Sequence, residues 1–130
     1  MTAPTRPHLV SLDHVQLAMP AGGENKARGF YCLMLGLSEM EKPADLAKRG
    51  GCWFANGAIT VHLGVEEGFC PAKKAHPAFR VLAIDTLAGD LHSAGHPVTW
   101  DKTIPSVRRF FTADPFGNRI EFIAEPEAAP

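Results

Sequence analysis

The sequence lacks long hydrophobic runs, an excess of one charge and a cysteine framework, and each absence excludes a class of protein. No apolar run approaches the ~20 residues that a membrane-spanning helix needs. The formal net charge is −1 over 130 residues, which argues against attraction to nucleic acid or to an anionic membrane. The three cysteines, Cys32, Cys52 and Cys70, are odd in number and have no Cys-x-x-Cys spacing. This disfavours a disulfide framework and is typical of the reducing cytoplasm, where we expect the protein to work.

The composition is that of an ordinary globular protein. Hydrophobic residues make up 45% of the chain and charged residues 21%, close to the average for such domains. Met1–His8 has no hydrophobic stretch, so we expect no secretory signal there. A chain of 130 residues can bury one core, and we expect a single domain over residues 1–130.

The first half of the chain reads as a strand, a helix and three further strands. Val10–Met19 alternates polar and apolar residues, the pattern of a half-buried strand. From Glu24 the period changes to that of an amphipathic helix, which Gly36 is expected to end. Three strands are predicted after it, over residues 37–42, 51–55 and 58–65. Asn56-Gly57 is expected to form the hairpin turn between the last two.

The second half repeats this order after a polar linker over residues 66–75. A strand is predicted over 76–84, then a helix capped by Asp85 or Thr86 that runs to about Ala94 and is stopped by Gly95. Strands are predicted over 97–102, 107–112 and 119–124. The pattern is therefore β-α-β-β-β twice, which predicts two similar modules, module 1 over about 9–66 and module 2 over about 75–125.

The first and last strands of each half carry one potential metal ligand each: His14, His62, His76 and Glu121. In every case the ligand lies on the face opposite the mostly apolar one. A single histidine on a strand is usually a solvated or hydrogen-bonded residue. A metal site is indicated only because all four residues lie on the corresponding face of their strands. Imidazole and carboxylate together suit Zn, Fe(II), Ni, Mn or Co, and an incomplete set of protein ligands leaves positions for water or substrate.

Other polar residues share these faces. Gln16 follows His14 at the next position on the same face, and Arg80 follows His76 at the second one. Either side chain could bind a substrate oxygen, and Arg80 fits a surface charge equally well. Arg108 and Arg109 are adjacent, so at most one of them faces the site if their strand is regular.

Three segments resemble the vicinal oxygen chelate superfamily of glyoxalases, bleomycin resistance proteins and extradiol dioxygenases. They are the opening strand LDHVQLA at residues 12–18, Gly29-Phe30-Tyr31 followed by Leu35-Gly36-Leu37, and the closing segment DPFGNRIEF at residues 114–122. The resemblance spans about Leu12 to Ala124. It implies an α+β fold in which two βαβββ modules form a cup-shaped mixed sheet with the helices on its outer face.

The resemblance also implies roles for the ligand residues. In metal-using members the corresponding positions make His14, His76 and Glu121 ligands of one divalent metal ion per site. Glyoxalase I adds a fourth ligand, commonly glutamate, where this sequence has His62. This departure argues against glyoxalase I itself, and it leaves His62 as either a fourth ligand or a base.

The expected function is a metal-dependent enzyme acting on a small oxygenated substrate that chelates the metal, of the lyase, isomerase or thiol transferase type. Ring-cleaving dioxygenases of the superfamily usually contain four modules, and this chain has room for two. The alternatives are a metal-free, drug-binding protein of the bleomycin resistance type and a divergent domain without activity. The resemblance further implies a homodimer, in which His14 and His62 would meet His76 and Glu121 of a second copy. A small-molecule substrate is the other expected partner, with no nucleic acid and no membrane.

Overall fold

The computed structural model describes residues 7–126, and its elements follow the predicted order. The first module contains β1 (Val15–Met19), α1 (Glu24–Arg28), η1 (Gly29–Met34), β2 (Ser38–Met40), α2 (Ala44–Ala47), β3 (Cys52–Asn56) and β4 (Ile59–Val65). The second contains β5 (Ala78–Val81), α3 (Ile84–Ser93), β6 (Thr99–Asp101), β7 (Arg109–Ala113) and β8 (Arg119–Ala124). Apart from the short α2, this is the β-α-β-β-β pattern twice. Among these helices, none combines the length and the apolar character needed to cross a membrane.

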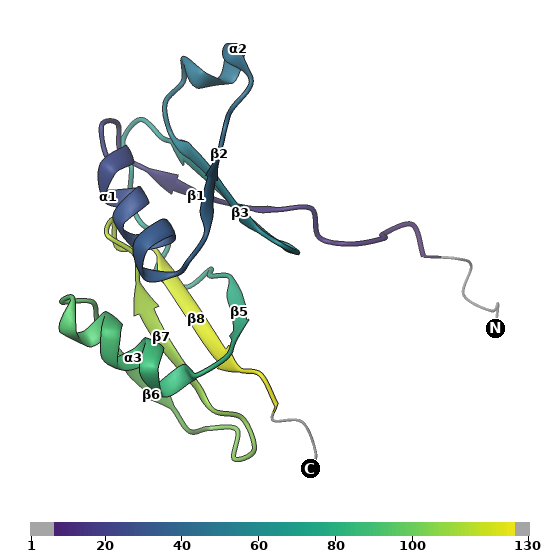
Figure 1. The fold of residues 1–130 in the computed structure, drawn as a ribbon, viewed down its shortest axis with the longest axis vertical. Helices are drawn as coiled ribbons and strands as arrows, with labels where there is room; N and C mark the ends of the chain where they lie inside the picture. The colour runs from purple at the N-terminus through teal and green to yellow at the C-terminus, as the bar shows by residue number, and fades with distance from the viewer. Residues whose placement is uncertain (1–6, 127–130) are drawn as a thin grey trace.

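The two modules have the same strand order. The first sheet is ordered β1-β4-β3-β2 and the second β5-β8-β7-β6. In each, the first and last strands of the module pair in parallel and the remaining neighbours are antiparallel. Figure 1 shows one module above the other, with α1 and α3 on the same side of the molecule. The predicted α+β fold of two βαβββ modules is confirmed, and the sheets are not closed into a barrel.

Each sheet buries one face against its helix. In the first module Val61 and Leu63, the buried hydrophobic residues of β4, flank His62 in the strand. They join the core with Phe30 and Tyr31 of the helix. In the second module Phe110, Ile120, Phe122, Ile84 and Leu91 form the matching layer. The apolar residues of the strands thus lie on one face of each sheet, and the polar residues between them lie on the other face.

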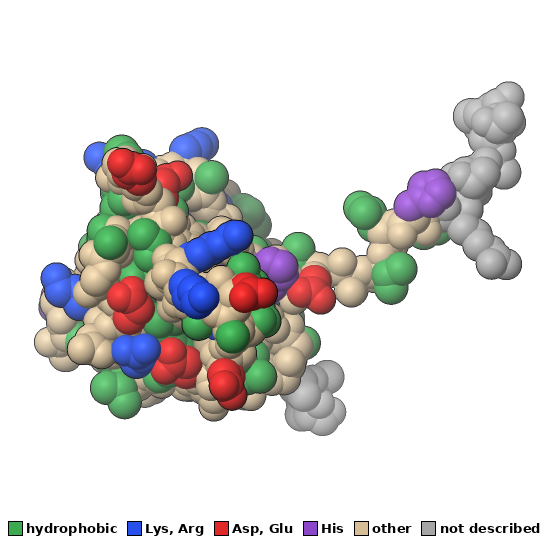
Figure 2. Space-filling view, turned by 90° about the horizontal axis from the view of Figure 1, so that it is seen from above, with side chains coloured by type: hydrophobic (Ala, Val, Ile, Leu, Met, Phe, Trp, Pro, Cys, Tyr) green, Lys and Arg blue, Asp and Glu red, His purple; other side chains and the backbone are tan. Residues whose placement is uncertain are grey.

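The first strand is shorter than predicted. We expected a strand over Val10–Met19, but β1 begins at Val15, which pairs with Val61 of β4. In this parallel register Ile59, the first residue of β4, is level with Asp13, so the residues before Asp13 have no strand beside them. They extend from the body as an arm (Figures 1 and 2), in which Leu9, Val10 and Leu12 are largely exposed.

The first helix differs from an ordinary α-helix in its second half. Gly36 ends it in the left-handed region (φ +78°), as predicted. The turn before this glycine is a π-helix, η1, in which the amide of Leu35 donates to the carbonyl of Phe30, five residues earlier. No residue pattern in this segment predicted the wider turn.

Two predictions of local chemistry were wrong. The second helix, α3, begins at Ile84 and has no side-chain cap; the residue before it, Ala83, lies in the left-handed region (φ +51°). Asp85 instead binds Arg108. In the first hairpin Asn56 pairs with Ile59, so the turn is Gly57-Ala58 rather than Asn56-Gly57. Only the glycine of this turn has positive φ, which is typical of a type II′ turn.

A buried polar junction joins the two modules. The hydroxyl of Tyr31, on η1, donates to Oδ2 of Asp114 at 2.7 Å, across 83 residues of sequence. The side chain of Asn118 donates to the same oxygen at 3.0 Å and to the carbonyl of Ala18, on β1, at 2.8 Å. Burial and the neighbouring Asp114 raise the pKa of Tyr31 well above its ordinary value. The phenol therefore stays protonated and acts as a donor.

Tyr31→Phe should destabilise the protein by about 1–3 kcal/mol, because the buried carboxylate of Asp114 loses a donor. The measurement is urea unfolding at neutral pH. Thr112→Val is the control, because its buried hydroxyl has no hydrogen-bond partner among the described residues, and its removal should be neutral or stabilising. Equal stability of Tyr31→Phe and wild type would contradict this role for the junction.

Candidate functional site

The first sheet carries a stack of three rings on the face opposite its helix. The ring of His62, on β4, lies parallel to that of Trp53, on β3, with centroids 4.2 Å apart. On its other side His14, which directly precedes β1, stacks at 4.0 Å. Gln16 lies opposite His62 in the parallel register. The structure therefore brings together the two ligand candidates of the first module, as their common face predicted.

The stack sets the protonation state of His62. Burial lowers the pKa of His62 from its ordinary value, and the neighbouring His14 lowers it further. At neutral pH the ring is therefore uncharged, which is the form that can ligate a metal or accept a proton. Trp53, which covers one face of the ring, was not among our predicted site residues. Its position opposite His62 in the antiparallel pair depends on strand register.

The second sheet brings His76 and Glu121 together. Nδ1 of His76 lies 2.8 Å from the carbonyl oxygen of Lys74, and a carbonyl only accepts, so Nδ1 carries the hydrogen. In the neutral ring Nε2 is then an acceptor. It lies 2.9 Å from Oε1 of Glu121, which is also an acceptor. Two acceptors at this distance require a cation between them, either a proton or a metal ion.

These two atoms fit a metal ion. Ligands bound 2.0–2.2 Å from one metal lie about 3 Å apart when their bonds are near perpendicular. The hydrogen bond from Nδ1 to a backbone carbonyl is the outer contact that metal-bound histidines usually make. His76 lies two residues before β5 and is held by the Lys74 carbonyl, while Glu121 is buried on β8. Both donors are therefore fixed in position by the protein.

Arg109 holds the other oxygen of Glu121. Its Nη1 donates to Oε2 of Glu121 at 3.1 Å and its Nη2 to Asp101 at 3.2 Å. The guanidinium therefore lies between the carboxylates of Glu121 and Asp101 and fixes the orientation of the Glu121 side chain. Arg108 points the other way and binds Asp85, as expected for adjacent residues of a strand. Alternation predicted that one of the two arginines faces the site, but only the structure identifies which.

The four ligand candidates do not form one cluster within the chain. Within residues 7–126, no group of three or more histidine, cysteine or acidic side chains is placed to hold a metal. His14 and His62 form one pair on the first sheet, and His76 and Glu121 form another on the second. A complete site from these residues would need the faces of two sheets to meet.

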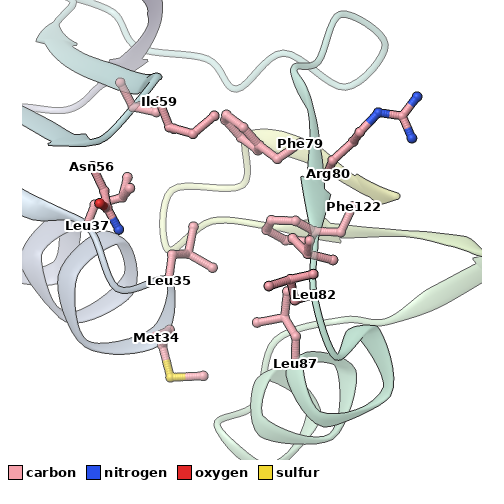
Figure 3. Close-up of a pocket in the computed structure, with 12 residues that line it drawn as sticks. Met34, Leu35, Leu37, Asn56, Ile59, Phe79, Arg80, Leu82, Leu87 and Phe122 are labelled. Carbon is pink, nitrogen blue, oxygen red and sulfur yellow. The ribbon is translucent and has the colours of Figure 1, made fainter. Parts of the chain in front are cut away.

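The two predicted substrate-binding residues lie outside these pairs. Gln16 is exposed, and its amide lies over Gly64, where a Cβ would be 2.9 Å from Nε2 of the glutamine. Arg80 is exposed and points away from an apolar pocket of about 410 Å³ between the modules (Figure 3). Neither His76 nor Glu121 lines that pocket. A larger cavity of about 810 Å³ on the second module does include Glu121, Arg109 and Arg80.

The lowered pKa of His62 predicts a pH dependence of stability. In the metal-free protein the unfolded chain binds a proton at His62 more readily than the folded chain does. The free energy of unfolding should therefore fall, relative to that of His62→Gln, as the pH drops below about 6.5. Urea unfolding of both proteins with a chelator, at about pH 7, 6 and 5, measures this difference. A constant difference across the three pH values would show that burial does not hold His62 neutral.

Solved structures place this fold among known proteins, although no family model and no curated protein matches the sequence. A glyoxalase/dioxygenase from Nostoc punctiforme is 22% identical, with a TM-score of 0.72, over 98% of this chain and 99% of that one. The fosfomycin resistance protein FosX from Listeria monocytogenes is 13% identical, with a TM-score of 0.70, over 94% and 96%. These two likenesses show the fold alone.

A third structure is much closer in sequence. It is a glyoxalase family protein from Bacillus anthracis, 49% identical to this chain, with a TM-score of 0.87. The alignment covers 94% of this chain and 100% of that one, so the likeness extends over both modules. The chain therefore belongs to the glyoxalase family, within the vicinal oxygen chelate superfamily.

Proposed function

We propose that this protein is a metal-dependent enzyme acting on a small oxygenated substrate, of the lyase, isomerase or thiol transferase type. His14, His76 and Glu121 would hold one divalent ion, Zn, Fe(II), Ni, Mn or Co. The metal, when bound, would act as a Lewis acid on the substrate oxygens that chelate it. The single observation that carries the proposal is the pair of His76 and Glu121, whose two acceptor atoms face each other at 2.9 Å.

We further propose that the site is completed by a second copy of the chain. His14 and His62 lie on one sheet and His76 and Glu121 on the other, and a twofold dimer can bring unlike sheets of two chains face to face. Two equivalent sites would result, each with histidines from one chain and the His76–Glu121 pair from the other. This arrangement explains why each half of the site is formed within a chain while the whole is not.

The chain's own residues would perform distinct tasks in such a site. Arg109 fixes the orientation of the Glu121 carboxylate. His62, kept neutral by burial, can take up a substrate proton or add a fourth ligand. The indole of Trp53 and the ring of His14 cover the two faces of His62, so its nitrogens at the ring edge are the atoms that remain for either task.

The first test is the metal content of protein purified without added metal or a histidine tag, measured by elemental mass spectrometry. We expect about one divalent ion per chain, as in a single-metal site. His14→Ala and Glu121→Gln should each weaken binding more than ~100-fold, beyond the loss typical of an outer hydrogen-bond partner. His92→Ala, which changes an exposed histidine of α3, should bind metal normally. A wild-type protein that takes up none of the five metals would overturn the proposal and favour the metal-free, drug-binding alternative.

A mixing experiment tests whether the site is shared between copies. His14→Ala and Glu121→Gln are unfolded together, refolded as a mixture and assayed for metal. A twofold heterodimer of the two variants has one site without either substitution, so random pairing should restore about a quarter of the wild-type sites. If each site were built within one chain, no site would be restored. That outcome would disprove the shared site while leaving metal binding itself intact.

A further inference from the structure

The polar face of the second sheet contains a second feature beside His76 and Glu121. The ring of Phe111, on β7, lies at its centre, opposite Glu121 in the antiparallel register. The guanidinium of Arg119 lies over this ring, 4.0 Å from its centroid, and the ring of His76 meets it edge-on at 5.3 Å. Arg119 and Glu121 are two residues apart on β8 and therefore share a face, at a backbone separation of about 6.6 Å.

Arg119 is a partly buried arginine without a carboxylate partner among the described residues, whereas Arg49 and Arg80, which also have none, are exposed. Three other arginines are neutralised: Arg28 by Glu39, Arg108 by Asp85, and Arg109 by Asp101 and Glu121. Among residues 7–126, no acidic oxygen lies within 4.0 Å of the Arg119 guanidinium. Its side chain is nevertheless partly buried. A guanidinium that has lost part of its water without gaining a counter-ion favours binding an anion.

The geometry also limits how this guanidinium can move. A guanidinium stacked on an aromatic ring is restricted in its rotation. Its N–H groups then point outward in the guanidinium plane, like a fork. That fork matches the two oxygens of a carboxylate, phosphonate or phosphate group. Arg109, which also approaches Phe111 at 5.6 Å, has a buried Nε with no hydrogen-bond partner. Within residues 7–126 this Nε is therefore an unsatisfied buried donor close to the same ring.

We propose that Arg119, held on Phe111, binds an anionic oxygen group of the substrate. The substrate class is then a small organic acid whose carboxylate or phosphonate lies on Arg119 while another of its oxygens lies at the His76–Glu121 pair. The contact at the His76–Glu121 pair rests on the proposed function, whereas the contact between the anion and Arg119 does not. Arg80 lines the larger cavity together with Glu121, but it is exposed, and we therefore assign the anion to the partly buried Arg119 rather than to Arg80.

The test uses methylphosphonate and acetate as probes, titrated by calorimetry into metal-free and metal-loaded protein. Wild type should bind one of the two anions, and the tighter one identifies the group. Arg119→Gln should weaken that binding about 10- to 100-fold, the loss expected for a charged hydrogen bond. Arg119→Lys should recover part of it, because it restores the charge but not the planar fork. Arg49→Gln should bind within about twofold of wild type, because Arg49 is exposed and lines neither of the two cavities, and an exposed charge contributes little.

The two proposals fail in different ways. Metal content is measured on every variant, and Arg119→Gln should retain its metal, since Arg119 is not a ligand. Loss of anion binding in Arg119→Gln, seen in the metal-free protein as well, supports the assignment even if no metal site exists. Unchanged binding in Arg119→Gln, or equal losses in Arg49→Gln, would overturn it. So would a wild type that binds neither anion, whatever its metal content.

Discussion

The buried carboxylate of Asp114 is the interaction on which the rest of the structure depends. It accepts hydrogen bonds from Tyr31 of the first module and from the backbone and side chain of Asn118. Asn118 in turn donates to Ala18, on the strand that follows His14. A carboxylate buried this deeply is stable only when its oxygens are satisfied, so the packing of one module against the other is coupled to one polar junction. The position of β1 relative to β8 follows from it.

The closing segment of the chain therefore has two functions. Its first residues, Asp114 and Asn118, form the junction between the modules. The next two residues on the polar face of β8, Arg119 and Glu121, lie within the candidate site. Because strand geometry fixes the spacing between these groups, the contact that joins the modules also positions the side chains proposed to bind substrate and metal. A change at the junction would thus alter the site without contacting it.

The predictions that failed concern contacts beyond the local pattern. Alternation continues through the arm before His14, yet a strand forms only where β4 runs beside it. Asp85 has the chemistry of a helix cap, but Arg108, brought near by β7, takes its carboxylate. The hairpin contains the expected Gly57, and the register of β3 on β4 moves the turn by one residue. In each case pairing between distant segments overrides a local preference.

By itself the sequence determined the order of the elements and the face on which each polar residue lies, because both follow from a local period in the chain. It thereby assigned His62 and Glu121 to the face away from the helices, and its motifs indicated the superfamily. The tertiary structure decided which groups touch: Trp53 and His14 on His62, Arg109 on Glu121, and an unpaired Arg119 on an aromatic ring. It also decided that the ligands form two separate pairs. These contacts join residues far apart in sequence, and they depend on strand order and register, which a local pattern does not contain.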